Sequence, residues 1–377
     1  LSFYGRLIYT FKNRFLLTAT LRNDQSSRFS PETRSSLFPS AAFAWRISDE
    51  KFLQNVKWLS NLKLRLGYGV TGQQDILNDY PYIANYSQGT TTAQYQFGSQ
   101  YYYVLRPDAY VKDIKWEETA TTNIGLDFGF VNGRVNGSID YYIKKTSDLL
   151  VNVAPPAGTN FNNNVLDNVG SLENKGMEIN LNCIPVITDN FTWEFGINFT
   201  YNKAEITKLL NVQEDNYVGI KTGGIAGGIG NTIQVHTVGY SPNSFYVYHQ
   251  LYDSNGKPLE GKYEDLNGDG KINENDLYRY EKPDADFRIG FNTSFMYKDW
   301  TLATSIRSEM GNFVYNNVYS VRGNLNAAGT TSSGLNNLSE NYLETYFRKD
   351  QYFSDYYVTD ASFIKMDYVS LAYSFKN

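Results

Sequence analysis

Regular alternation of apolar and polar residues is the feature that most limits the folds open to this chain. Side chains on a β-strand point alternately to opposite faces, so each alternating stretch predicts a strand with one apolar and one polar face. The stretches run for about nine to eleven residues, the length a tilted strand needs to cross an outer membrane. The clearest are 62–70, 123–130, 193–201 and 287–297.

The connections between the predicted strands are of two kinds. Short turns are expected at 11–15, 131–134, 188–191 and 298–300. Long connections are expected at 24–37, 72–116, 146–174, 203–245 and 311–361. Short periplasmic turns at one rim and long extracellular loops at the other are typical of outer-membrane barrels. The sequence therefore predicts an all-β fold, a transmembrane antiparallel up-and-down β-barrel, with about thirteen or fourteen strands in this chain.

The composition excludes several other classes of protein. Aromatic residues make up 16% of the chain, with 32 Tyr, which suits strands and membrane interfaces. The net charge is −5 and Lys and Arg do not cluster, so nucleic acid is excluded as a partner. Cys183 is the single cysteine, which leaves no disulfide within the chain and no thiolate metal site. No signal peptide and no apolar run long enough for a spanning helix occurs.

Strand-like sequence occupies both ends of the chain, from Leu1 onward and again over 362–375. A barrel must close, because unpaired backbone groups in lipid are prohibitively costly. We therefore expect residues 1–377 to be an incomplete transmembrane barrel domain whose remaining strands belong to a longer protein. A short amphipathic helix is also expected over 48–61, on the side of the short turns.

The sharpest local motif is the segment 265–276, which fits the template of a calcium-binding loop. The expected oxygen ligands are the side chains of Asp265, Asn267, Asp269, Asn273 and Asp276 and the backbone carbonyl of Lys271. The final position is Asp instead of the usual Glu, which shortens its reach. We expect a structural Ca²⁺ that braces an external loop. The alternative is a solvated loop rich in Asp and Asn that binds no metal.

Three further patterns are less specific. Tyrosines over 95–104 are expected to pack a loop or join a membrane girdle, although stacking on sugar rings or peptide side chains is the alternative. The glycine run 223–230 lacks the Lys-Ser or Lys-Thr of a phosphate loop and predicts an ordinary loop. His236 and His249 lack zinc spacing, and no arrangement of carboxylates or nucleophiles predicts catalysis. The chain is therefore not expected to be an enzyme.

Several phrases in a fixed order carry a family resemblance. They are LKLRLGYGVTGQQDI at 62–76, WEET at 116–119 with NIGLD at 123–127, NVGSLENKGME at 168–178, the stretch 239–248, the calcium-like loop, and ASFIKM at 361–366. Over essentially its whole length the chain resembles the SusC/RagA-type TonB-dependent outer-membrane transporters.

This resemblance implies a twenty-two-stranded barrel with an N-terminal plug, located in the cell outer membrane. It also implies TonB-dependent import of bulky nutrients, either oligosaccharides or peptides, and a SusD-like lipoprotein lid as partner. The plug, the TonB-contacting segment and the closing strands are not found in this sequence. The substrate and the residues that bind it cannot be read from the sequence. The alternative is a secreted β-rich protein that binds or degrades glycans and uses the calcium loop structurally, in which case the apolar faces would meet in a closed core.

Overall fold

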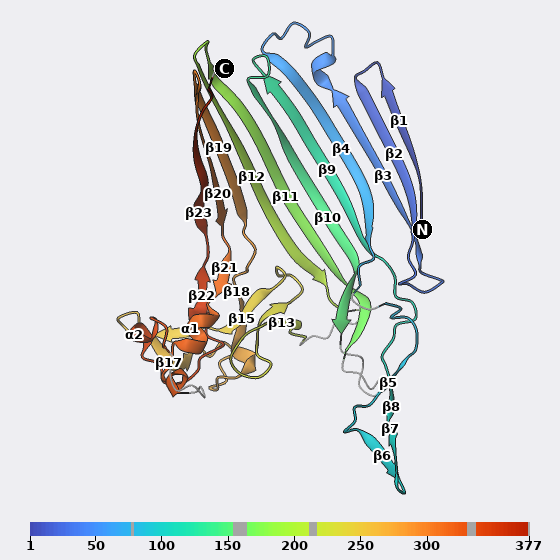
Figure 1. The fold of residues 1–377 in the computed structure, drawn as a ribbon, viewed down its shortest axis with the longest axis vertical. Coiled ribbons are helices and arrows are strands. Elements are labelled where there is room, and N and C mark those ends of the chain that lie inside the picture. The colour runs from blue at the N-terminus through green and yellow to red at the C-terminus, as the bar shows by residue number, and fades with distance from the viewer. Residues whose placement is uncertain (77–78, 154–163, 211–216, 330–336, 376–377) are drawn as a thin grey trace. The chain divides into compact units, whose positions relative to one another are not determined.

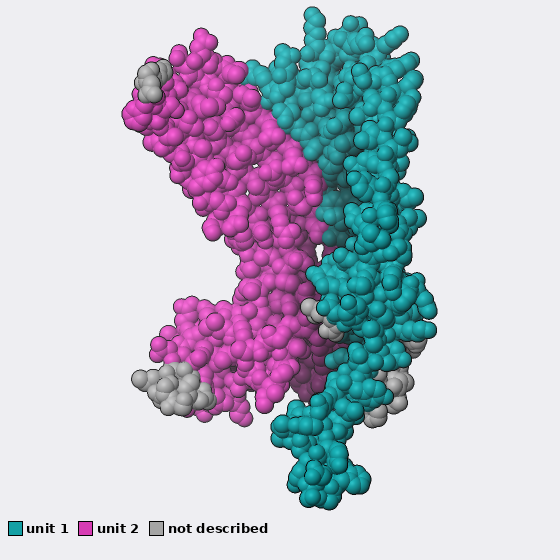
Figure 2. All heavy atoms as spheres, turned by 45° about the vertical axis from the view of Figure 1, so that its right-hand side comes forward, with its two compact units in different colours: residues 1–177, 207–213 teal, residues 178–206, 214–377 magenta. Residues whose placement is uncertain are grey.

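The computed structural model describes residues 1–76, 79–153, 164–210, 217–329 and 337–375. Within these residues the main element is a β-sheet of eleven strands (Figure 1). The chain divides into two compact units, which Figure 2 colours separately. Unit 1 comprises residues 1–177 and 207–213, and unit 2 comprises 178–206 and 214–377. Strand β11 contributes residues to both units.

In unit 1 the sheet order follows the chain, β1-β2-β3-β4-β9-β10-β11. The strands are β1 Ser2–Phe11, β2 Phe15–Gln25, β3 Ser35–Arg46, β4 Leu59–Gln73, β9 Glu117–Phe130, β10 Val135–Val153 and β11 Val165–Ile187. The connection from β4 to β9 adds two small hairpins, β5 Tyr86–Gln88 with β8 Leu105–Pro107, and β6 Gln94–Phe97 with β7 Gln100–Tyr103. A single 3-10 turn, η1, covers Ile47–Asp49.

In unit 2 the sheet order is β11-β12-β19-β20-β23. The strands after β11 are β12 Phe191–Lys208, β19 Phe287–Tyr297, β20 Trp300–Met310 and β23 Phe363–Tyr373. The connection from β12 to β19 contains β13 Ile220–Gly224, β14 Thr232–His236, β15 Ser244–Tyr248, β16 Gln250–Tyr252, β17 Pro258–Tyr263, η2 Glu274–Asp276 and β18 Leu277–Tyr280. The connection from β20 to β23 contains β21 Phe313–Tyr315, α1 Asn317–Arg322, η3 Leu325–Gly329, α2 Tyr342–Thr345, η4 Asp355–Tyr357 and β22 Val358–Asp360. No helix in the described part of the chain has the length and apolarity to cross a membrane.

One face of the sheet in unit 1 is apolar and exposed. The register places large apolar side chains side by side across six strands, in the row Tyr9, Leu17, Phe43, Leu66, Ile124 and Tyr141. Leu66 is 42% exposed and Ile124 is 48% exposed. Apolar side chains that share a face without burying one another require an apolar surrounding, which lipid supplies. The all-β fold with a lipid-compatible outer face is confirmed, and these residues do not meet in a closed core.

Aromatic side chains in unit 2 lie at two levels of the sheet. Tyr297 and Trp300 pair at the short turn and are 53% and 48% exposed. At the other end of β19, the rings of Phe287 and Tyr201 lie 5.4 Å apart. Ten residues along a strand tilted by about 40° correspond to a height of roughly 25 Å. This height equals that of the apolar band of an outer-membrane barrel, so the two levels match the two membrane interfaces.

Two details of the sequence-based prediction are wrong. Residues 48–61 form no α-helix. The backbone instead makes η1 and further separate turns, in each of which an N–H group donates to the carbonyl three residues earlier. The donors are Glu50, Leu53, Val56 and Leu59. Repeated turns of three residues produce a spacing of apolar residues close to that of a helix. The main sheet has eleven strands, not thirteen or fourteen, within the described residues. The surplus strand-like segments form small sheets inside the long connections.

A buried cluster of aromatic and aliphatic side chains lies in unit 1 where the long connections after β2 and β4 meet the strands, which we call the loop end of unit 1. It consists of Phe29, Phe38, Ile76, Ile114 and Trp116. The Trp116 ring lies 5.2 Å from that of Phe29 and 5.4 Å from that of Phe38, and its Nε1 donates to the Arg34 carbonyl at 3.0 Å. The cluster thereby fixes the connections after β2 and β4 to the ends of β3 and β4.

Gly72, in the family-like phrase of β4, is explained by this cluster. A Cβ atom at Gly72 would lie 2.1 Å from the ring of Phe38 and 2.9 Å from that of Trp116. Both rings are nearly buried, so neither has space to move away. Glycine is required here because the rings pack directly on the backbone.

The orientation of the sheet predicts opposite effects for two neighbouring residues. Ile124 faces outward near the middle of the apolar band, and Asn123 faces the other side. Ile124→Arg should lower the free energy of unfolding by about 2–4 kcal/mol, because a charge would enter lipid. Asn123→Arg is the matched control and should cost far less. Urea unfolding of the full protein in lipid vesicles measures both, and equal losses would contradict the assigned orientation.

Packing on Gly72 generates a second prediction. Gly72→Ala should destabilise the loop end of unit 1 by about 1–3 kcal/mol, because the added methyl group overlaps two rings. Hydrogen exchange of the connections after β2 and β4 measures this local loss. Gly5→Ala is the control, since nothing lies within 4 Å of a Cβ there. Unchanged protection in Gly72→Ala would refute the packing explanation.

Candidate functional site

The opposite face of the sheet in unit 1 carries polar and charged side chains. Nη2 of Arg65 in β4 lies 2.8 Å from a carboxylate oxygen of Asp127 in β9 and 2.8 Å from one of Asp140 in β10. Nζ of Lys63 lies 2.7 Å from the other oxygen of Asp127. Charged groups are costly in contact with lipid, so this face is the water-facing side of the barrel wall.

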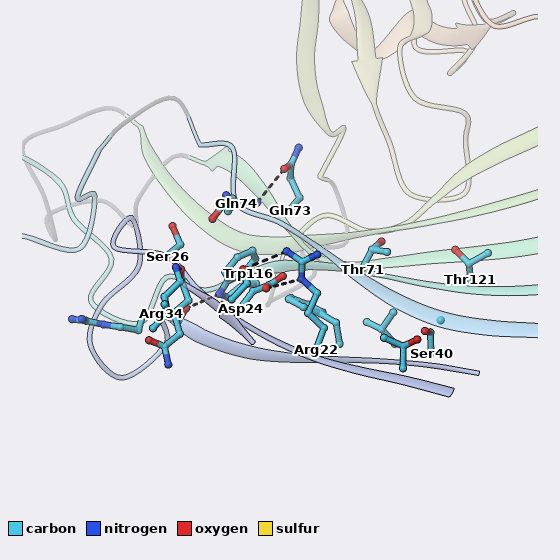
Figure 3. A pocket seen from close by; sticks show the side chains of 18 of the residues that line it. Arg22, Asp24, Ser26, Arg34, Ser40, Thr71, Gln73, Gln74, Trp116 and Thr121 are labelled. Atoms are coloured by element: carbon cyan, nitrogen blue, oxygen red, sulfur yellow. Dashed lines mark hydrogen bonds and ion pairs between the residues drawn. The ribbon is translucent and has the colours of Figure 1, made fainter. Parts of the chain in front are cut away.

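A cavity of about 980 Å³ opens on the polar face near the loop end (Figure 3). Its walls come from β1, β2, β3, β4 and β9 and from the connections after β2 and β4. The labelled lining side chains are Arg22, Asp24, Ser26, Arg34, Ser40, Thr71, Gln73, Gln74, Trp116 and Thr121. The volume is at the upper end of the range for small-molecule sites, so the cavity has room for a bulky solute.

The chemistry of this cavity is that of a polar binding surface. Nε of Arg22 lies 2.7 Å from a carboxylate oxygen of Asp24, so the two charges compensate each other. Hydroxyl and amide side chains make up most of the remaining lining, and Trp116 adds an aromatic surface. The wall across β3 and β4 is built from small residues, with Ser40 opposite Gly69. Such a lining suits uncharged or weakly charged polar solutes.

The sequence alone indicates no substrate-binding residues, because the cavity brings together residues that are distant in the chain. Its lining residues come from five strands that are far apart in the chain. Gln73 and Trp116 belong to the family-like phrases, but nothing local to them indicates a shared cavity. The one indication in the sequence is alternation, which places the two charged residues Arg22 and Asp24 on the same face of β2.

The predicted calcium ligands lie together in the loop between β17 and β18. The Asp265 carboxylate accepts hydrogen bonds from the N–H groups of Gly268 at 2.8 Å and Gly270 at 2.7 Å. Asp276 is fully buried, and its carboxylate accepts from the N–H groups of Leu266 at 3.0 Å and Asn273 at 2.8 Å.

This geometry does not by itself establish a metal site. Among the described residues, no three His, Cys, Asp or Glu side chains are grouped so as to hold a metal ion, which includes the three aspartates of this loop. Calcium binding therefore stays a prediction.

The remaining residues singled out in the sequence are not among those that line the large cavity. Tyr101 and Tyr102 belong to the small β6–β7 hairpin, outside the main sheet, and are 61% and 57% exposed. The first two residues of the glycine run, Gly223 and Gly224, end strand β13, and the rest of the run forms the predicted loop to β14. Burial lowers the pKa of His236.

His249 belongs to a hydrogen-bonded cluster centred on Asp355. One Asp355 carboxylate oxygen lies 2.8 Å from His249 Nδ1 and accepts from the Tyr278 hydroxyl at 2.8 Å, and the other accepts from the Gln250 N–H at 3.0 Å. Burial, together with the Asp355 carboxylate, raises the pKa of Tyr278. The cluster joins the connection between β12 and β19 to the one between β20 and β23.

Comparison with known proteins also indicates an outer-membrane β-barrel. Residues 1–232 match the model of the family described as TonB dependent receptor-like, beta-barrel. The TonB-dependent receptor SusC of Bacteroides thetaiotaomicron is 45% identical over 378 aligned residues, which cover 100% of this chain and 38% of SusC. The TonB-dependent receptor P26 of Formosa agariphila is 36% identical over 325 residues, which cover 84% of this chain and 32% of P26.

A solved structure agrees with these sequence matches. A chain of the RagAB peptide transporter superposes with a TM-score of 0.78 and 26% identity, covering 99% of this chain and 41% of that one. This chain thus spans between about a third and two fifths of the length of the relatives it matches. The SusC/RagA-type resemblance and the location in the outer membrane are confirmed, and that location is incompatible with the secreted alternative. The chain belongs to the family of TonB-dependent receptor-like β-barrel proteins.

Proposed function

We propose that this chain forms part of the barrel wall of an importer that carries bulky nutrients, oligosaccharides or peptides, across the outer membrane. The observation that carries the proposal is the large polar cavity of unit 1 on the water-facing side of a sheet whose other side is lipid-compatible. A solute in that cavity is surrounded by hydroxyl and amide groups, by the Arg22–Asp24 ion pair and by Arg34, and it is separated from lipid by one layer of backbone. The chain's role is transport and not catalysis.

The family relationship supports two partners for this importer. A SusD-like lipoprotein would act as a lid on the extracellular side, where the long connections lie. The TonB complex would supply energy through an N-terminal part of the protein that lies outside this chain. Co-purification of the full protein with an epitope-tagged SusD-like lipoprotein tests the first partner.

Import through the polar face predicts that narrowing the cavity slows uptake. Ser40→Trp places a large ring in the cavity lining and should reduce uptake of bulky substrates by roughly half or more, because the solute competes with the ring for volume. Uptake of labelled oligosaccharide and peptide mixtures by cells is measured against a strain that lacks the protein. Collapsing the proton-motive force should abolish the signal.

The control for this experiment is Leu37→Trp. Leu37 lies in the same strand, on the opposite face, and is 53% exposed, so a tryptophan there faces lipid. Uptake by Leu37→Trp cells should match that of unaltered cells. Normal uptake in Ser40→Trp would refute a path along this cavity, and absence of energy-dependent uptake in unaltered cells would refute import.

We propose further that the loop 265–276 binds a structural Ca²⁺ through Asp265, Asn267, Asp269, Lys271, Asn273 and Asp276. Asp276 supports this proposal, because it is fully buried and forms no ion pair with any residue in the described part of the chain. Backbone N–H groups of Leu266 and Asn273 offset part of the cost of burying this carboxylate, and a bound cation would offset more of it. The ion would fix the turn between β17 and β18.

Calcium binding is tested by titration calorimetry of the chelator-treated full protein with CaCl₂. Asp265→Asn should weaken binding by about tenfold or more, because one ligand charge is lost. Asp253→Asn is the control, since Asp253 also caps a turn, accepting from the Asn255 and Lys257 N–H groups, but lies outside the loop. Absence of binding in the unaltered protein, or equal affinity in Asp265→Asn, would refute the site.

A further inference from the structure

A second, smaller cavity of about 330 Å³ lies in unit 2. Strands β13, β14, β15 and β18 and the 3-10 turn η2 contribute to its walls, together with Phe353 from the connection between β20 and β23. Its volume is near the lower limit for small-molecule sites, so it can hold one ring-sized group but not a whole chain. No lining residue was singled out in the sequence as a binding residue.

One side of this cavity is an aromatic wall with a fixed orientation. Tyr248 stacks on Tyr263 with ring centres 4.9 Å apart and meets the edge of Phe353 at 6.4 Å. The guanidinium of Arg279 lies 5.1 Å from the centre of the Tyr246 ring. Because these contacts hold the rings before any ligand arrives, little conformational entropy is lost on binding.

Four of the polar side chains that line the cavity are neutral, and one of them, Asn231, donates to the Gly227 carbonyl at 3.2 Å. Among the described residues, the hydroxyls of Tyr246, Tyr248 and Thr232 have no hydrogen-bond partner. Tyrosine hydroxyls are protonated near neutral pH and can donate, and burial raises the pKa of Tyr246 and of Tyr248 further. They are available to a ligand that carries hydroxyl groups of its own.

The charged groups of the cavity compensate each other. Nζ of Lys221 lies 3.2 Å from a carboxylate oxygen of Glu274, and both side chains are half-exposed or more. Binding a charged ligand would require one of them to leave its partner. The lining therefore favours a neutral ligand over the charged terminus or side chain of a peptide.

We propose that this cavity binds one ring of a neutral oligosaccharide. A sugar ring has apolar C–H faces, which match the aromatic wall, and hydroxyl edges, which match the free tyrosine and threonine hydroxyls. The inference rests on the proposed import function, because it names oligosaccharide as the substrate class. Its place within the long connection of unit 2 makes it a binding site separate from the large cavity of unit 1.

The test measures binding by the full-length protein to an array of neutral oligosaccharides and, in parallel, to an array of short peptides. The best oligosaccharide is then titrated against Tyr248→Phe and Tyr246→Phe, which retain the rings and remove only the hydroxyls. Each variant should lose affinity by roughly tenfold, the effect of one hydrogen bond. Tyr252→Phe, at a half-exposed tyrosine outside the cavity, is the matched control and should bind as the unaltered protein does.

Heat-modifiable gel migration confirms that each variant is folded. Equal affinity in Tyr248→Phe, Tyr246→Phe and the control would overturn the site, and so would binding to peptides alone. Energy-dependent uptake in cells is measured separately. If uptake persists while both tyrosine variants bind normally, the cavity assignment fails and the import function stands; if unaltered cells show no uptake, the import function itself fails.

Discussion

The pairing register of the strands is the constraint on which the rest of the structure depends. Because side chains alternate, a shift of one residue would exchange the two faces of a strand. The row through Leu66 and Ile124 is apolar across six strands, while the row through Ser40, Gly69 and Thr121 is small and polar. A slip in any one strand would place polar groups in lipid and apolar rings in water. Register therefore determines both membrane insertion and the chemistry of the cavity.

The buried cluster at the loop end of unit 1 fixes the connections outside the membrane, as strand pairing fixes the sheet within it. Phe29 and Ile114 are fully buried although they belong to connections, and Trp116 ties them to the carbonyl of Arg34. A cavity next to flexible loops would change shape continually. The cluster gives one side of the cavity a rigid boundary, which preorganised binding requires.

The sequence predicted most of the sheet because lipid imposes a strict period of two on each strand. Where strands continue past the membrane, lipid no longer imposes this alternation. The sequence therefore predicted a long connection over 146–174, whereas β10 extends to Val153 and β11 begins at Val165. The false helix at 48–61 arose from successive turns with nearly helical spacing. Neither cavity was foreseen, because Arg22, Ser40 and Trp116, like Tyr248 and Phe353, become neighbours only through long-range pairing. The proposed calcium loop could be predicted from the sequence because its six candidate ligands belong to one short segment, 265–276.

Asp355 has a mechanical consequence. Its carboxylate accepts from the backbone of Gln250 and contacts the side chains of His249 and Tyr278. Asp355 is therefore one of several links between the two long connections, beside the Ser354 hydroxyl, which donates to Gln250. Displacement of either connection would be opposed by these bonds to the other. The two connections are thus coupled, and a change in the β20–β23 connection that breaks these bonds would remove the support of His249 and Tyr278 in the other connection.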